Sequence, residues 1–298
     1  GSSSSIGGSG DLTLSGTITN STSGRDLTKV GAGTLTLSGN SSSTWTNGSL
    51  LINNGTLALT SFANNTSSRP VTIGGSSTSA TLSYGGSESS NGTVFTVGSA
   101  GGTFINTTNS NATTLSGNVT LNGTLTIRQN GTSDNTWSGA ISGTGGISIN
   151  STGSGKTIFS GTGSTYSGTT TLTAGTLVLR SANTLPNGSP LILGGGAFFT
   201  GLTSGYDQTM STFALTNDAT ISLGTGAHNL VFSASNGVSW TAGKILTING
   251  WTGTAGSSGT AGRIFVGSNS SGLTSTQLGQ ISFTGFGAAT LLSTGELV

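Results

Sequence analysis

A short pattern of a glycine, a threonine and two alternating leucines recurs along this chain and limits what it can fold into. The stretch VGAGTLTLSGN, residues 30–40, returns in close copies as NNGTLALTS at 53–61, LNGTLTIRQ at 121–129 and TAGTLVLRS at 173–181. Apolar residues that alternate with Thr or Ser are typical of a β-strand that buries one face and exposes the other. Each copy therefore predicts a short strand that needs an apolar partner face.

Many more short strands with the same alternation are expected, and Asn-Gly pairs separate several of them. Asn and Gly tolerate positive φ, so each pair suits a tight turn. No window carries the 3.6-residue apolar period of a capped helix, and the chain is therefore expected to be all-β. The expected strands cover residues 12–14, 35–37, 57–59, 71–73, 82–84, 95–97, 119–121, 125–127, 147–149, 177–179, 191–193, 221–223, 230–232 and 238–240.

The composition excludes several classes of protein. The 298 residues include 8 Lys and Arg and 7 Asp and Glu, for a net charge of +1, which provides no basic surface for nucleic acid. The 53 glycines follow no Gly-X-Y period, so the chain is not collagen-like. No run approaches the roughly 18 apolar residues that a membrane span needs. The sequence contains no cysteine, which excludes disulfides and thiolate metal sites.

Two longer segments repeat one plan. Residues 29–61 contain KVGAGTLTLSG, a polar stretch and then NNGTLAL, while residues 156–181 contain KTIFSG, GSTYSG and then TAGTLVL. A strand and turn plan that returns along a chain is typical of stacked coils, and it favours a β-solenoid over a β-sandwich. Coils of about 20–25 residues, spaced by about 4.8 Å, would give about a dozen layers. Outward-facing Thr and Ser would form ladders between coils, where stacked like charges would repel.

The blocks GAGTLTLSGN at residues 31–40 and AGTLVL at 174–179 resemble the autotransporter-associated β-strand repeat, also called the passenger-associated transport repeat. This resemblance implies a right-handed parallel β-solenoid (β-helix) in a bacterial protein that is secreted to the extracellular space or the cell surface. Residues 245–267 and 273–298 resemble the terminal module of such repeat proteins, which precedes a C-terminal sorting tail that often opens with a Pro-Glu-Pro motif. The sequence stops at Val298, before any such tail.

We expect three parts along the chain. Residues 1–10, GSSSSIGGSG, contain one large apolar residue and are expected to be a flexible N-terminal segment. Residues 11–200 carry the clearer repeats and are expected to form the β-solenoid. Residues 201–298 carry a weaker repeat with aromatic-rich strands. They are expected to form a C-terminal β module, for which a β-sandwich-like packing is left open.

The sequence offers no assembled catalytic motif. The seven acidic residues are Asp11, Asp26, Glu88, Asp134, Asp207, Asp218 and Glu296. Solvated turn residues are a simpler interpretation of them than a catalytic carboxylate pair. His228, the single histidine, has no nucleophile motif or metal-ligand pattern around it and is expected in a turn or at the surface. We therefore expect no enzyme, cofactor or metal site, although acids gathered in one groove would favour a polysaccharide-cleaving enzyme.

Aromatic and basic residues occupy equivalent positions in the two long segments. Trp45 and Tyr166 lie in comparable turns, and Trp137 lies between them in the sequence. These three side chains are candidates for packing inside coils, for a subunit interface or for stacking on glycans, with packing favoured. Lys29 and Lys156 begin the two segments, and surface solubility or a local acid partner is favoured over a role as interface cations.

The edges of a solenoid lead to a hypothesis about function. The strands at both ends of the rod would present unpaired backbone groups, which can pair with another chain. We expect copies of this protein to associate head to tail into a surface fibre or matrix. The residues expected at this interface are Asp11, Leu12, Leu14, Ile18, Trp251, Leu291 and Leu292. The alternative is a monomeric adhesin or a module that binds surface glycans.

Overall fold

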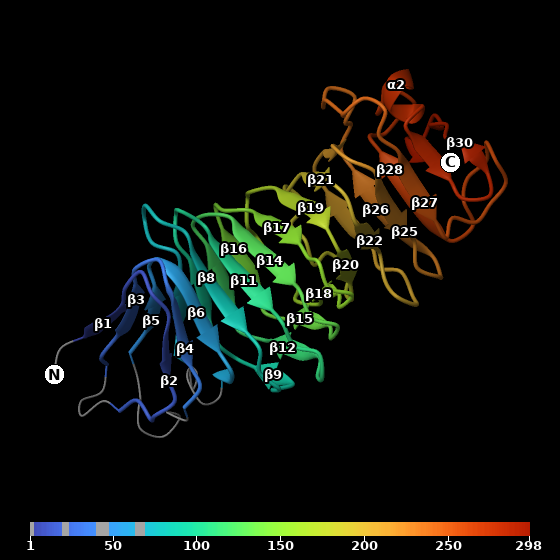
Figure 1. Ribbon diagram of the computed structural model, residues 1–298. Coiled ribbons are helices and arrows are strands. Elements are labelled where there is room, and N and C mark those ends of the chain that lie inside the picture. Colours follow the sequence, from blue (N-terminus) through green and yellow to red (C-terminus); the bar gives the residue numbers. More distant parts are fainter. Residues whose placement is uncertain (1–2, 20–23, 40–47, 63–68) are drawn as a thin grey trace.

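The computed structural model describes residues 3–19, 24–39, 48–62 and 69–298. These residues are mostly in β-strands and turns, and the one helix with described bounds is α2, Ser275–Leu278. Figure 1 shows an elongated stack of coils, with the N-terminus at one end and the C-terminus at the other. The expected all-β fold, a parallel β-solenoid, is confirmed.

Two sheets, A and B, begin at the N-terminal end of the stack. Sheet A contains β1 (Ser4–Gly7), β3 (Leu27–Val30), β5 (Leu50–Ile52), β7 (Val71–Ile73), β10 (Phe95–Val97), β13 (Val119–Leu121) and β16 (Ile141–Gly143). Sheet B contains β2 (Leu12–Leu14), β4 (Thr34–Leu37), β6 (Gly55–Leu59), β8 (Ala80–Tyr84), β11 (Gly102–Asn106), β14 (Leu125–Gln129), β17 (Ile147–Asn150), β19 (Thr170–Ala174), β21 (Leu191–Leu193) and β24 (Phe213–Leu215).

Sheets C and D extend to the C-terminal end. Sheet C contains β9 (Ser90–Asn91), β12 (Thr113–Leu115), β15 (Asn135–Trp137), β18 (Thr157–Phe159), β20 (Thr176–Leu179), β22 (Ala197–Phe199), β25 (Ala219–Ser222), β27 (Leu246–Asn249), β29 (Ile281–Phe283) and β30 (Gly287–Ala288). Sheet D contains β23 (Gln208–Met210), β26 (His228–Phe232), β28 (Gly262–Val266) and β31 (Glu296–Leu297). From β25 to β29 the chain alternates between these two sheets.

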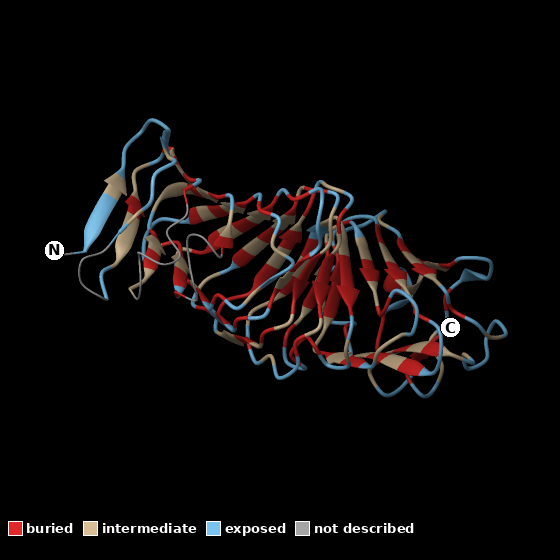
Figure 2. Cartoon of the chain, turned by 90° about the horizontal axis from the view of Figure 1, so that it is seen from below, coloured by how far each residue is buried: buried red, intermediate tan, exposed pale blue. Residues whose placement is uncertain are grey.

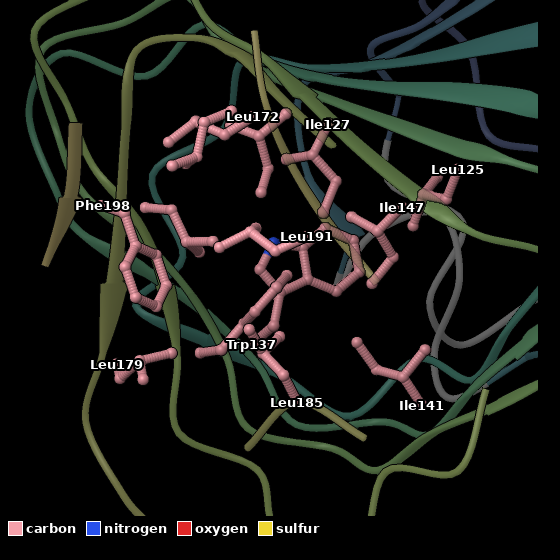
Figure 3. Close-up of a cluster of buried hydrophobic side chains, with 14 of the residues drawn as sticks. Leu125, Ile127, Trp137, Ile141, Ile147, Leu172, Leu179, Leu185, Leu191 and Phe198 are labelled. Carbon is pink, nitrogen blue, oxygen red and sulfur yellow. The ribbon is translucent and has the colours of Figure 1, made fainter. Parts of the chain in front are cut away.

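The interior of the stack is built from columns of apolar residues in register. One column runs through sheet B, and its members are Leu12, Leu35, Leu57, Leu82, Phe104, Ile127, Ile149, Leu172, Leu193 and Leu215. From Leu35 onward each member is at most 1% exposed. Figure 3 shows how side chains from several coils meet in the same interior. The regular alternation in the sequence is therefore the inward and outward alternation of a stacked strand.

The outward faces of the same strands carry the expected hydroxyl ladder. Thr34, Thr56, Thr81, Thr103, Thr126, Ser148 and Thr171 follow one another in register across sheet B. These positions are half-exposed or close to it. Neutral hydroxyls can stack at the strand spacing without the repulsion that like charges would meet, which accounts for the low charge of the chain.

Glycines form a second ladder at the corner between sheets A and B. Gly123, Gly145 and Gly168 occupy this turn in successive coils, where the backbones approach closely. A Cβ atom on Gly145 would lie 2.0 Å from the carbonyl oxygen of Gly123, and one on Gly168 would lie 2.5 Å from the carbonyl oxygen of Gly145. These contacts leave no room for a side chain, so the recurring glycine is a requirement of the stacking itself.

The coils lengthen toward the C-terminus. Up to β25, most partner residues in adjacent coils lie 20–25 positions apart, as expected: Leu35 pairs with Leu57 and Thr157 with Leu177. Leu246 then pairs with Ile281, a separation of 35 residues, and α2 lies in the added segment. The last strands, β30 and β31, reverse direction and pair antiparallel with β29 and β28.

Three sequence-based expectations differ from the structure. Residues 4–7 of the expected flexible segment form β1, because they pair with β3. Residues 238–240 form no strand: the Val238 N–H closes a turn on Ser235 O, and the Trp240 indole N–H donates to Phe213 O at 3.3 Å. The part after residue 200 continues the solenoid instead of forming a sandwich-like unit, because β22 and β25 pair parallel within sheet C across that point.

Candidate association surface

The N-terminal end of the stack is formed by β1 and β2, the first strands of sheets A and B. Among the described residues each pairs on one side only, β1 with β3 and β2 with β4. Leu12 is 43% exposed, whereas Leu35 in the next coil is 1% exposed. Ile6, Leu14 and Ile18 are half-buried against the core. Figure 2 shows the first strand coloured largely as exposed. This end therefore presents an apolar rung beside two strands that pair on one side only within the described part of the chain.

The free backbone groups of β2 follow from its bonds to β4. The carbonyl oxygen of Leu14 accepts a hydrogen bond from the Ser38 N–H at 3.0 Å. Because the amide groups of successive residues in a strand point to opposite sides, the N–H and C=O of Thr13 face away from β4. Thr13 therefore lies where a further strand would pair.

Asp11 accepts a hydrogen bond from the next coil, and equivalent bonds recur along the chain. Its Oδ1 accepts a hydrogen bond from the Thr34 N–H, one coil ahead, at 2.7 Å. Equivalent bonds join the carboxylates of Asp26, Asp134, Asp207 and Asp218 to the N–H groups of Ser49, Lys156, Asn229 and Ile245. A charged acceptor makes a stronger bond to a backbone N–H than a neutral one does. These five acids therefore link successive coils.

The two glutamates are also engaged within the chain. Glu88 accepts hydrogen bonds from the hydroxyls of Tyr84 and Ser61. The buried Glu296 accepts from the Ser258 hydroxyl at 2.6 Å and from the Gly259 N–H at 2.8 Å. Over the described ranges no group of three or more His, Asp or Glu is placed to hold a metal ion. The acids thus act as backbone and hydroxyl acceptors at separate places along the rod.

Lys29 differs from the surface residue that the sequence indicated. It lies in the inward column between Ile6 and Ile52 and is 1% exposed. Its Nζ donates to three carbonyl oxygens, those of Val30, Gly31 and Asn54, at 2.9, 2.7 and 3.1 Å. Burial lowers the pKa of Lys29, an effect that the Asp11 carboxylate partly offsets. The fold therefore stabilises this charge with carbonyl groups at a corner of the coil.

Lys156, at the equivalent place in the second segment, has an acid partner. Its Nζ lies 3.6 Å from Asp134 Oδ1, and both side chains are about one third exposed. The expectation of a local acid partner therefore holds for Lys156, while Lys29 takes the buried arrangement.

The C-terminal end of the stack is covered by its own chain. Trp251 is 5% exposed and packs edge to face against Phe283 and Phe286, with ring centroids 5.4 and 4.7 Å apart. Leu291 pairs with Leu297 in an antiparallel bridge. The Leu292 N–H donates to Glu296 O at 2.8 Å. The C-terminal end therefore differs from the simple end of a parallel stack that the sequence indicated, because the chain turns back after β29 and its last two strands pair antiparallel with β28 and β29.

Sheets A and B are also covered on their C-terminal sides. The Thr241 N–H donates to Leu215 O of β24 at 2.9 Å, and the Thr165 N–H donates to Ile141 O of β16 at 2.8 Å. The two ends of the stack therefore differ: among the described residues β1 and β2 are outermost strands that run parallel to their neighbours, whereas the C-terminal end finishes in the two-residue antiparallel strands β30 and β31.

The aromatic candidates lie inside the coils. Trp137 is 2% exposed and contacts the ring of Phe104 edge to face at 5.2 Å, and Tyr166 is 1% exposed. Both side chains are therefore packed inside the coils, which was the favoured interpretation. Neither ring is exposed to stack on a glycan or on a partner subunit. Trp45 lies outside the described residues.

Tyr166 provides a test of this burial. Its hydroxyl lies 2.6 Å from Thr170 Oγ1, and burial raises its pKa to about 12. Because the folded-state pKa lies above the unfolded value near 10, this group's contribution to stability is complete below about pH 10. It is lost as the pH rises toward 12, at up to about 1.4 kcal/mol per pH unit. We expect Tyr166→Phe to flatten this decline in the free energy of unfolding between pH 10 and 12.

Urea unfolding at several pH values measures this decline. The difference between the two proteins at pH 7 reports the lost hydroxyl bond alone and serves as the internal control. Parallel pH profiles for the wild type and Tyr166→Phe would contradict the buried, neutral phenol.

His228 is buried and not at the surface as expected. It is 3% exposed, its Nδ1 lies 2.9 Å from Gly226 O, and its Nε2 lies 2.8 Å from Thr200 Oγ1. Because a carbonyl oxygen can only accept, Nδ1 donates to Gly226 O, and this bond together with the contact to Thr200 fixes the orientation of the ring. A Cβ atom on Gly205 or Gly262 would lie within 2.5 Å of the ring, so these two glycines make the space that it fills.

Comparison with known proteins identifies repeats in this chain. The passenger-associated-transport-repeat family model matches residues 27–59 and 152–179, which hold β3 to β6 and β18 to β20. No curated protein and no solved structure gives a significant match. In the described part of the chain no helix has the length and apolar character to cross a membrane. The repeats and the β-solenoid together indicate a passenger-type surface protein.

Proposed function

We propose that this protein is a structural, non-catalytic rod of a secreted bacterial surface protein and that it associates through its N-terminal edge. The observation that carries this proposal is the difference between the two ends of the stack. β1 and β2 pair on one side among the described residues, whereas β28 and β29 are covered by β31 and β30. An open strand edge is the surface to which another strand adds.

This polarity changes the expected mode of association. A head-to-tail fibre that continues the parallel stack needs a parallel strand edge at both ends of each copy. The C-terminal cap, formed by β30 and β31, replaces that edge with two-residue strands that run antiparallel to their neighbours, and very short edge strands pair poorly with another chain. Two identical molecules then share only the N-terminal edge, and a surface that pairs with itself gives a twofold symmetric dimer. In such a dimer β2 pairs antiparallel with β2 of the second copy, through the outward amide groups of Thr13.

The chemistry of the N-terminal edge suits this contact. Leu12 is the exposed end of the apolar column in sheet B, so a second copy would continue the buried column across the interface. Burial of a leucine side chain contributes about 1.5–3 kcal/mol. Asp11 is the single charged residue among the first 24 positions, and its carboxylate already binds the Thr34 N–H. Little charge therefore opposes the approach of two such ends.

Sedimentation equilibrium tests the proposal. We expect wild-type protein of 29.0 kDa to form a concentration-dependent dimer and Leu12→Lys to weaken it by about 10-fold to 100-fold, since each 1.4 kcal/mol is one factor of ten. Leu202→Lys is the matched control, because Leu202 is 47% exposed but lies far along the chain in the loop after β22. A wild type that stays monomeric at high concentration, or an equal loss with both variants, would refute this association.

A further inference from the structure

A column of buried polar side chains lies inside the solenoid, at the corner between sheets B and C. Asn106 and Gln129 close β11 and β14, and Asn135 and Thr157 open β15 and β18. All four are at most 1% exposed. Such residues are among those least often found fully buried, so their presence in the core of an apolar rod needs a physical reason.

Several atoms of these side chains have no hydrogen-bond partner in the protein. They are Asn106 Nδ2, Gln129 Oε1, both Oδ1 and Nδ2 of Asn135, and Thr157 Oγ1. Each buried polar atom without a partner costs about 1–3 kcal/mol. Five such atoms at one corner of the fold would remove a large part of the stability of a typical domain.

The stacking places these atoms next to one another. Asn106 pairs in register with Gln129 across sheet B, and Asn135 pairs with Thr157 across sheet C. The two pairs are joined at the corner, because Gln129 Nε2 donates to Ser133 O, two residues before Asn135. The unpartnered atoms therefore follow the rod axis from coil to coil.

The strand spacing indicates what can bond these atoms. Adjacent strands lie about 4.8 Å apart, so equivalent side-chain atoms in successive coils are separated by about that distance unless the side chains lean toward each other, as Thr152 and Asn130 do. One water molecule that makes two bonds of about 2.8 Å at a tetrahedral angle spans roughly 4.6 Å. The coil repeat is thus close to the span of one bridging water.

We propose that a file of ordered water molecules runs through this corner of the solenoid and joins Asn106, Gln129, Asn135 and Thr157 across successive coils. Each water has two or more polar partners, as buried waters require. The donors and acceptors of the four side chains are neutral, and none of them is a carboxylate, which suits water better than a divalent cation. The file adds a polar requirement for register, because a coil that slips by one residue would turn Asn135 to the outer face.

A crystal structure at a resolution that shows water provides the direct test. We expect density peaks within about 2.6–3.2 Å of the Asn135 amide and the Thr157 hydroxyl. A corner without density would overturn the proposal. Peaks with five or more oxygen neighbours at about 2.3–2.6 Å would also overturn it, since those distances belong to a bound cation.

Whether one substitution raises or lowers the melting temperature gives an independent test. Thr157→Val keeps the shape of the side chain and removes its hydroxyl. If water bonds this hydroxyl, the melting temperature should fall by about 1–4 °C, as expected for the loss of about one hydrogen bond in a domain of this size. If the hydroxyl is unpaired, its removal should raise the melting temperature, and that result would overturn the proposal. Thr114→Val, at a half-exposed position of β12, is the matched control for the change of side chain.

Discussion

Removal of residues 286–298 should turn the dimer proposed above into a long polymer. The deleted segment contains β30 and β31, which cover the edges of β29 and β28. Without it the outermost described strands at both ends would each pair parallel with an inner neighbour, β1 with β3, β2 with β4, β28 with β26 and β29 with β27. The N-terminal edge of one copy could then continue the stack of another. Such a heterologous contact does not close, so growth would continue along the rod axis.

Electron microscopy and light scattering measure this conversion. We expect filaments, with a rise in mean mass of more than about tenfold over the wild type, and a circular dichroism spectrum that retains its β character. Leu12→Lys in the truncated chain is the control, because it damages the partner edge and should suppress the filaments. A truncated protein that keeps its β structure and forms no polymer would contradict the role of the cap.

A valine at Gly145 should prevent stable folding. Its Cβ atom would lie 2.0 Å from Gly123 O and 2.5 Å from Gly123 C. These backbone atoms belong to the preceding coil and cannot move aside as a flexible side chain could. Separation of the two coils at this corner would also strain the strands of sheets A and B that flank it. We expect a loss of about 4 kcal/mol or more in the free energy of unfolding.

Urea unfolding followed by circular dichroism measures the effect of this valine. Gly188→Ala is the matched control, because a Cβ atom there meets nothing within 4 Å, and it should change the free energy of unfolding by less than about 0.5 kcal/mol. A Gly145→Val protein with wild-type stability would show that the coils can separate at this corner without cost.

Sequence-based prediction succeeded for features that depend on neighbouring residues and failed for features that depend on residues distant in the sequence. The alternation in LTL at Leu35–Leu37 is local, and it correctly predicts an inward Leu and an outward Thr. Lys29 could not be placed in this way, because its three carbonyl partners come from two coils and are gathered only by the stacking. The cap was missed for the same kind of reason: β30 and β31 have two residues each, too few to carry a periodic pattern.

The proposed association surface remains a prediction for the N-terminal residues. Leu12 and Leu14 lie in β2, the outermost described strand of sheet B, and Asp11 and Ile18 flank that strand. Trp251, Leu291 and Leu292 belong to the covered end. Nothing in their local sequence distinguishes a side chain that is buried by its own chain from one that would contact a second molecule.

The sequence by itself determined the coil. The period of two places apolar residues inward, the recurrent glycine permits the close turn, and the neutral hydroxyls allow identical rungs to stack, and all three are properties of a few neighbouring residues. Only the tertiary structure decided how the stack ends. Whether a strand edge is open or covered depends on where a distant segment returns, and backbone hydrogen bonds, which any residue but proline can donate, leave no mark of that return in the sequence.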